Sequence, residues 1–269
     1  ALVQEDLADP DAARRRKLEA ELGFDPEECP EQALNAALQW ASQVGDAALS
    51  ELAPAIAASG ASPDLALIGQ LASAGGIVGT PEISPDSIVH LEHGAPWERA
   101  IHDARMLRHQ LGNVSGPVCN SSLHDLLGMS SEAAANWSVP VGRSPVAVAI
   151  PVNDRQLQFV PRKRNPAGRR FELARFLGEY LSPSTQKAHW LASTDLSTFR
   201  QKYQRAFAAE FLCPIDSLTS FLGGDFSSYA IEEAAAEFDV SEKTIESLLL
   251  NNGYVHHHGA DSLPYRMAA

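Results

Sequence analysis

One run of residues shapes every structural interpretation of this chain: Gly168-Arg169-Arg170-Phe171-Glu172-Leu173-Ala174-Arg175-Phe176-Leu177-Gly178-Glu179-Tyr180-Leu181. Its apolar positions, at 171, 173, 174, 176, 177, 180 and 181, cover nearly the whole circumference of a helix. A helix of that kind has protein on most of its sides. The run therefore predicts a central helix buried within its domain.

One polar stripe interrupts this apolar surface. Glu172, Arg175 and Glu179 are spaced three and four residues apart, which places them on one face of the helix. Arg175 has the reach to bridge both carboxylates, and a buried arginine is tolerated only when it is well paired. We expect a buried charge ladder of Glu172, Arg175 and Glu179 that fixes how the helix packs, which is a structural role and not a catalytic one.

The composition indicates a globular protein. The chain has 269 residues, 45% of them hydrophobic, with no run that approaches 18 apolar residues. This favours a soluble protein with one large or two modest domains and no membrane partner. Three cysteines in no metal or redox spacing suit a reducing compartment, so the cytoplasm is the expected location. The first residue is Ala1 with no signal-peptide pattern after it, which leaves open a preceding segment.

Charge is unevenly distributed along the chain. Residues 1–95 hold 16 acidic and 4 basic residues, a net charge of −12 out of the total of −13. This asymmetry predicts two units. We expect an acidic helical N-terminal region at residues 1–94, a folded domain at residues 95–255 and a tail at residues 256–269.

Periodicity and turn residues predict a mainly helical α+β fold with one small sheet. The segment 145–160 contains two apolar runs around Asn153-Asp154-Arg155, which is typical of a hairpin. The linker before residue 95 contains His90 and His93, but no further ligand at finger spacing accompanies them. Helices are expected at residues 11–22, 30–58, 63–72, 96–111, 123–127, 168–181, 199–211, 230–238 and 242–250.

The loop into the central helix is the most basic part of the chain. Arg162, Lys163, Arg164, Arg169 and Arg170 form a candidate anion-binding or partner-binding surface. No aromatic residues alternate with these bases as they do in single-strand-binding proteins. Docking of an acidic protein surface, or simple exposure of these charges to solvent, is therefore favoured over binding of nucleic acid.

The order of the central run resembles the metal-binding helix of the ImmA/IrrE family of zinc-dependent endopeptidases, in which a phrase such as R-x-R-F-x-x-A-H-E-x-G-H-x-L is expected. Phe207-Ala208-Ala209-Glu210-Phe211-Leu212-Cys213-Pro214 resembles the phrase F-A-A-E-L-L-M-P that follows that helix. The resemblance extends over about residues 96–255. It implies a zincin-like domain with a small β-sheet packed on the central helix.

The residues that would carry the family's chemistry are absent from this motif. Arg175 and Glu179 stand where the family has histidines, and Phe176 stands where it has the general-base glutamate. Arginine has no lone pair for a metal, and phenylalanine cannot exchange a proton. The stretch 201–205, where the family's third ligand would lie, contains no carboxylate. The resemblance thus implies a zincin-like shell with no catalytic residue, no metal and no cofactor.

Three functions follow from these observations. The first is a non-catalytic ImmA/IrrE-like protein that regulates or scaffolds by binding a protein partner, such as a transcription regulator of the same system. The second is a metallo-endopeptidase that cleaves a helix-turn-helix repressor with substitute ligands, such as Glu179, His189 and Glu210. The third is a DNA-binding regulator that uses the basic loop or the terminal helical pair, whose spacing is near that of a helix-turn-helix. The sequence leaves the oligomeric state open.

Overall fold

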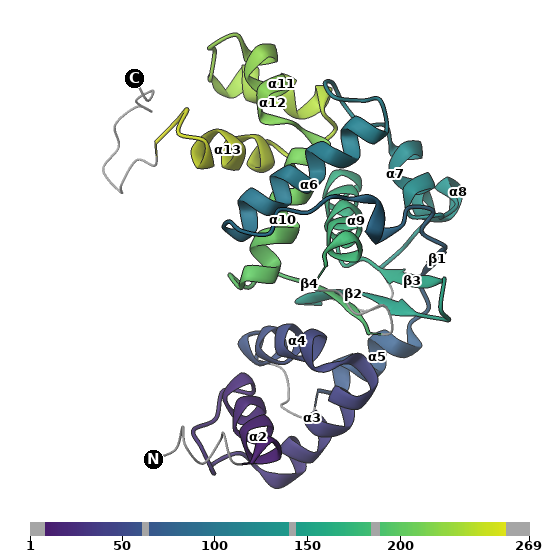
Figure 1. The fold of residues 1–269 in the computed structure, drawn as a ribbon, viewed down its shortest axis with the longest axis vertical. Helices are drawn as coiled ribbons and strands as arrows, with labels where there is room; N and C mark the ends of the chain where they lie inside the picture. The colour runs from purple at the N-terminus through teal and green to yellow at the C-terminus, as the bar shows by residue number, and fades with distance from the viewer. Residues whose placement is uncertain (1–8, 61–64, 140–143, 184–188, 257–269) are drawn as a thin grey trace. The chain divides into compact units, whose positions relative to one another are not determined.

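The computed structural model describes residues 9–60, 65–139, 144–183 and 189–256 (Figure 1). Helices dominate these residues, and one four-stranded antiparallel sheet accompanies them, which confirms the predicted α+β, mainly α class. The chain divides into two compact units, which we call the sheet unit and the helical unit. The sheet unit comprises residues 1–81, 128–162 and 184–201, and the helical unit comprises residues 82–127, 163–183 and 202–269.

The sheet unit begins with helices that the sequence predicted. Residues 30–58 were expected as one helical pattern, and Gly45 divides it in two by adopting a φ of 86° between α3 and α4. Glycine tolerates this left-handed conformation because it has no Cβ. The helices are α2 (Pro10–Glu21), α3 (Glu31–Val44), α4 (Asp46–Ala58) and α5 (Ala66–Ser73), with the short α8 (Ser131–Ala135) later in the chain.

The sheet has the strand order β1-β3-β2-β4, with every neighbouring pair antiparallel. The predicted hairpin is confirmed as β2 (Val146–Pro151) and β3 (Leu157–Val160), in which Val148 is opposite Val160. The two outer strands, β1 (Ile77–Gly79) and β4 (Leu191–Thr194), were not predicted, because three or four residues are too few to show an alternating pattern.

The core of the sheet unit forms where α4 packs against β2 and β4. Leu49 and Leu52 of α4 are fully buried and belong to the same apolar cluster as Val146 and Val148 of β2. Burial of this apolar surface is the main contribution to the stability of the unit.

The helical unit is arranged around α9 (Pro166–Leu181), which contacts α6 (Pro96–Gln110), α7 (Asn120–Leu126) and the single-turn η1 (Pro85–Ser87). The predicted central helix is therefore present. The unit also contains α10 (Phe199–Leu212) from residue 202 onward. The remaining helices are α11 (Ile215–Leu222), α12 (Ser228–Glu237) and α13 (Glu242–Asn251), of which α12 contacts both neighbours.

The two units interleave along the sequence, whereas the charge distribution predicted a single boundary between residues 94 and 95. The difference arises from β1, because residues 77–79 pair with β3 and so belong with residues 128–162. Residues 82–94 belong instead with α6. Among the described residues, none of the helices is long and apolar enough to cross a lipid bilayer.

Candidate functional site

The charged stripe of α9 lies inside the helical unit. Asn165 caps the helix by accepting a hydrogen bond from the Gly168 backbone N–H at 2.5 Å, and Pro166 follows at the first helical position. From this start, one face of α9 directs Glu172, Arg175 and Glu179 into the interior, where their exposed fractions are 1%, 4% and 1%.

Protein groups surround the side chains of this stripe. The Glu179 carboxylate accepts a hydrogen bond from Gln204 Nε2 of α10 at 2.7 Å, and Glu172 accepts one from the Lys163 backbone N–H at 3.4 Å. The Phe176 ring is fully buried. A catalytic metal site keeps an open coordination position for water and substrate, whereas these side chains are enclosed by protein.

α9 and α10 approach each other closely beside this stripe. A Cβ atom added to Gly178 would lie 2.5 Å from the ring of Phe207. Only glycine permits that contact, since the Phe207 side chain occupies the space that any larger residue would need.

The substitute ligand set of the second hypothesis has no support. Glu210 pairs with Arg105, and His189 belongs to the sheet unit, where it packs against Gly45. Among the described residues, no three His, Cys, Asp or Glu side chains cluster in a way that could hold a metal ion.

Five basic residues were predicted to form a surface, but the side chains of two of them, Arg162 and Arg170, are buried. Arg170 is 3% exposed and donates hydrogen bonds to the carbonyls of Phe238 and Asp239, both at 2.8 Å, and to that of Val118. Its guanidinium therefore connects three segments of the helical unit and does not face solvent. Burial lowers the pKa of Arg170.

Arg162 departs from the prediction in the same way. Its side chain is 4% exposed in the sheet unit, where it pairs with Asp195 at 2.6 Å and donates to the Pro145 carbonyl. Of the remaining three positions, Arg164 is exposed, whereas Lys163 and Arg169 are half-buried. An arginine-rich run in a sequence does not distinguish a solvated charge from one that binds buried carbonyls.

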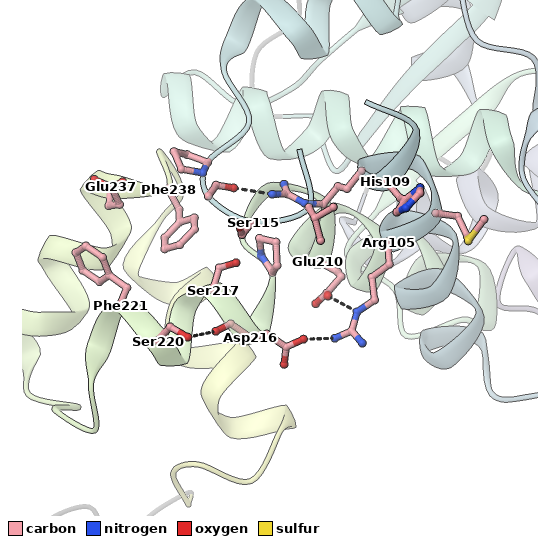
Figure 2. Close-up of a pocket in the computed structure, with 16 residues that line it drawn as sticks. Arg105, His109, Ser115, Glu210, Asp216, Ser217, Ser220, Phe221, Glu237 and Phe238 are labelled. Carbon is pink, nitrogen blue, oxygen red and sulfur yellow. Dashed lines mark hydrogen bonds and ion pairs between the residues drawn. The ribbon is translucent and has the colours of Figure 1, made fainter. Parts of the chain in front are cut away.

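A pocket of about 690 Å³ lies within the helical unit. It is bordered by α6, the 114–117 loop, the end of α10, α11 and the end of α12. Figure 2 shows Arg105, Glu210 and Asp216 at one end and Phe221 and Phe238 at the other. No local pattern in the sequence predicts this pocket, because its lining combines residues 105–117 with residues 210–238.

The charged end of the pocket is organised by Arg105. Its Nε donates to the carboxylate of Glu210 at 2.6 Å, and its Nη2 lies 3.4 Å from Asp216 (Figure 2). Burial lowers the pKa of Arg105, but the hydrogen bond and charge of Glu210, together with the charge of Asp216, more than offset this, so the pKa is raised. Glu210 is 2% exposed and also accepts from the Ile215 backbone N–H at 3.3 Å.

A second arginine of α6 holds one wall of the pocket in place. Arg108 is 1% exposed and donates to the carbonyls of Phe211 and Gly116, both at 2.6 Å, and to Asn113 Oδ1 at 3.1 Å. These contacts fasten the loop after α6 to the end of α10. Because its donors serve the protein itself, Arg108 has a structural role in the pocket.

The opposite end of the pocket is aromatic. The rings of Phe221 and Phe238 lie edge to face, with centroids 6.2 Å apart and an interplanar angle of 76°. Phe238 is buried, but 46% of Phe221 is exposed. The arrangement can hold an apolar group against the rings and a charged group beside Arg105 and Asp216.

Comparison with family models, with characterised proteins and with solved structures gave no match for this chain.

Two groups of residues with defined contacts in the structure were not predicted from the sequence. Arg105 and Arg108 are three residues apart on α6 and so lie on neighbouring faces, but they stand in no motif. His90, assigned to a linker, bonds through Nδ1 to the buried carboxylate of Asp103 at 2.9 Å, and the Tyr203 hydroxyl donates to the same oxygen at 2.6 Å. Pairings over such sequence separations leave no local pattern.

Proposed function

We propose that this chain is a non-catalytic ImmA/IrrE-like protein, a pseudo-metallopeptidase that regulates or scaffolds by binding a protein partner such as a transcription regulator. One observation carries the proposal. Arg175, Phe176 and Glu179, which occupy the positions of the family's metal motif, are buried in α9, and Gln204 binds the Glu179 carboxylate.

The chemistry of these three side chains supports a non-catalytic role. A zinc protease needs neutral histidines as ligands, a carboxylate base and a water molecule on the metal. Arg175 is protonated at any usable pH and repels a cation, and Phe176 cannot accept a proton. Glu179 alone has lone pairs to offer, and one of its oxygens already accepts from Gln204.

The terminal helical pair favours a protein partner over DNA. α12 and α13 contact each other, and Ser241 caps α13 by accepting from the Thr244 backbone N–H at 3.2 Å. The exposed start of α13 carries Glu242 and Lys243, with Glu246 one turn further along. These two carboxylates and one amine give the start of α13 a net negative charge, which repels phosphates. DNA-binding helices instead gain most of their affinity from basic residues.

An endopeptidase assay tests the non-catalytic role. The full chain, with His256, His257 and His258 replaced by alanine to remove adventitious metal binding, is incubated with fluorescein-labelled casein and zinc. We expect the same background cleavage with and without a chelator. Zinc-dependent cleavage that is lost in Glu179→Gln or Glu210→Gln would contradict the proposal.

A capture experiment tests the binding role. The same chain is immobilised and exposed to an extract of its native host, and an unrelated protein of similar negative charge serves as the control. We expect a specific partner that is retained at full length after incubation with zinc. A partner recovered only as defined fragments would indicate proteolysis, and retention no better than by the control would contradict partner binding.

A further inference from the structure

We infer that the pocket of the helical unit is a peptide-docking site, and that it takes a partner segment with an apolar side chain next to a lysine or arginine. The inference rests on the proposed partner-binding function and gives it a location and a chemistry. Three properties of the pocket lead to it: its size, its exposed aromatic ring and its charge.

The size and lining of the pocket suit one or two side chains of a peptide. A volume of about 690 Å³ lies within the range of roughly 300–1,000 Å³ that is usual for binding sites. Met106, Val114, Pro117 and Pro214 add apolar surface to the lining. An apolar side chain inserted there would lose contact with water, which is the main source of binding energy at protein interfaces.

Phe221 is the residue best placed to contact such a side chain. It is 46% exposed, lies near the end of α11 and packs edge to face with Phe238 in the lining of the pocket. Exposed aromatic side chains whose rotamers are fixed by packing are the usual centres of binding energy. Phe221 is therefore the expected anchor contact.

The charge of the lining selects the residue beside the apolar group. Arg105 and Arg108 contribute two positive charges, and Glu210, Asp216 and Glu237 contribute three negative ones, which gives a net charge of −1 with His109 neutral. The net charge that a ligand would meet is more negative than this sum, because Arg108 is buried and Arg105 forms an ion pair of 2.6 Å with Glu210.

Asp216 and Glu237 are the exposed carboxylates of the lining, and Asp216 is the one that lies beside Arg105. Its side chain is 84% exposed, and its contact with Arg105 is 3.4 Å long. A lysine or arginine of the partner can therefore pair with Asp216 at little cost in desolvation. An acidic or phosphorylated ligand would instead have to compete with Glu210 for Arg105, which disfavours both nucleic acid and phosphopeptides.

Fluorescence anisotropy with labelled octapeptides tests this inference on the full chain. The probe has two leucines flanked by lysines, and its matched versions carry glutamates in place of the lysines or serines in place of the leucines. We expect the leucine–lysine probe to bind at least about tenfold more tightly than either version, which is about 1.4 kcal/mol. Equal affinity for all three peptides, or preference for the glutamate version, would overturn the inference.

Two variants locate the binding site, each with a matched control. Phe221→Ser should weaken binding of the probe by about tenfold, whereas Tyr229→Ser, which alters an aromatic side chain that is 68% exposed outside the pocket, should not. Asp216→Lys should reverse the preference toward the glutamate version, whereas Glu246→Lys, the same change in charge on α13, should leave it unchanged. Thermal unfolding confirms that each variant is folded.

The outcomes separate this inference from the proposed function. Zinc-dependent cleavage together with lysine-selective peptide binding would overturn only the non-catalytic role. A captured partner whose binding is unchanged by both Phe221→Ser and Asp216→Lys would overturn only the docking site. Binding that the control variants alter as much as the pocket variants do would also count against the pocket.

Discussion

At the scale of single residues, the buried charges of α9 are expected to depend on one another. Glu172, Arg175 and Glu179 lie within two turns of one helix and are at most 4% exposed. Removing one charge from such a group leaves the others buried with less compensation, which is more costly than removing the whole group.

Replacing Arg175 tests this dependence. We expect Arg175→Met to lower the free energy of unfolding by about 3 kcal/mol, because two carboxylates stay buried without the guanidinium. The triple variant Arg175→Met, Glu172→Gln and Glu179→Gln should lose less than the single variant. Urea denaturation measures the free energy of unfolding of each variant. If the loss in the triple variant equalled the sum of the losses in the three single variants, the three charges would not depend on one another.

Cys119 provides a second test at this scale. The exposed thiol accepts from the Ser122 backbone N–H at 3.5 Å, and its Sγ lies 3.0 Å from the hydroxyls of both Ser121 and Ser122. These hydrogen bonds lower the pKa of Cys119 from 9.0 to about 7, whereas burial raises the pKa of Cys213 to about 12.

The thiolate is the reactive form, so alkylation should follow these pKa values. With iodoacetamide, the rate at Cys119 should rise as the pH increases and reach half of its maximum near pH 7, while Cys213 stays unmodified. Replacing Ser121 and Ser122 by alanine should move the midpoint toward the ordinary value of 9.0. Mass spectrometry after timed labelling gives both rates, and an unchanged midpoint in the variant would refute the explanation.

At the scale of elements, the sequence predicted best where a local pattern repeats often enough. α9 and α6 each show a helical period over several turns, the β2–β3 hairpin shows two apolar runs around the turn residues Asn153-Asp154-Arg155, and the structure has all three. β1 and β4 are too short for such a signal, and they form because a neighbouring strand is already present. Arg170 was misplaced because its carbonyl partners come from segments more than 50 residues away.

The contact between α9 and α10 gives a prediction at this scale. Alanine favours a helix over glycine by about 1 kcal/mol, yet Gly178→Ala should destabilise the protein by about 1–3 kcal/mol because its Cβ would overlap the Phe207 ring.

Gly69→Ala in α5 is the matched control for this prediction. The added Cβ would lie 3.4 Å from Trp40, an ordinary contact, so the helical preference should dominate and the stability should stay the same or rise by up to about 1 kcal/mol. Thermal unfolding of both variants measures the difference. Equal effects of the two substitutions would show that the close approach of α9 and α10 contributes nothing.

At the scale of the whole molecule, composition did not locate the two units. The acidic excess of residues 1–95 changes along the sequence, but the contacts that define the sheet unit join residues 77–79 to β3 and α4 to β4. Contacts between residues so far apart in the sequence do not appear in its composition. The pocket was unpredictable for the same reason, since Arg105 and Asp216 are 111 residues apart.

The zinc content of the purified chain tests the central proposal, that Arg175, Phe176 and Glu179 of α9 stand at the positions of a family's metal motif without binding a metal. The chain is prepared with His256, His257 and His258 replaced by alanine, supplied with zinc, dialysed and analysed by mass spectrometry of the metal. We predict far less than one zinc per chain, with no change in Glu179→Gln. One zinc per chain, lost in Glu179→Gln, would contradict the account.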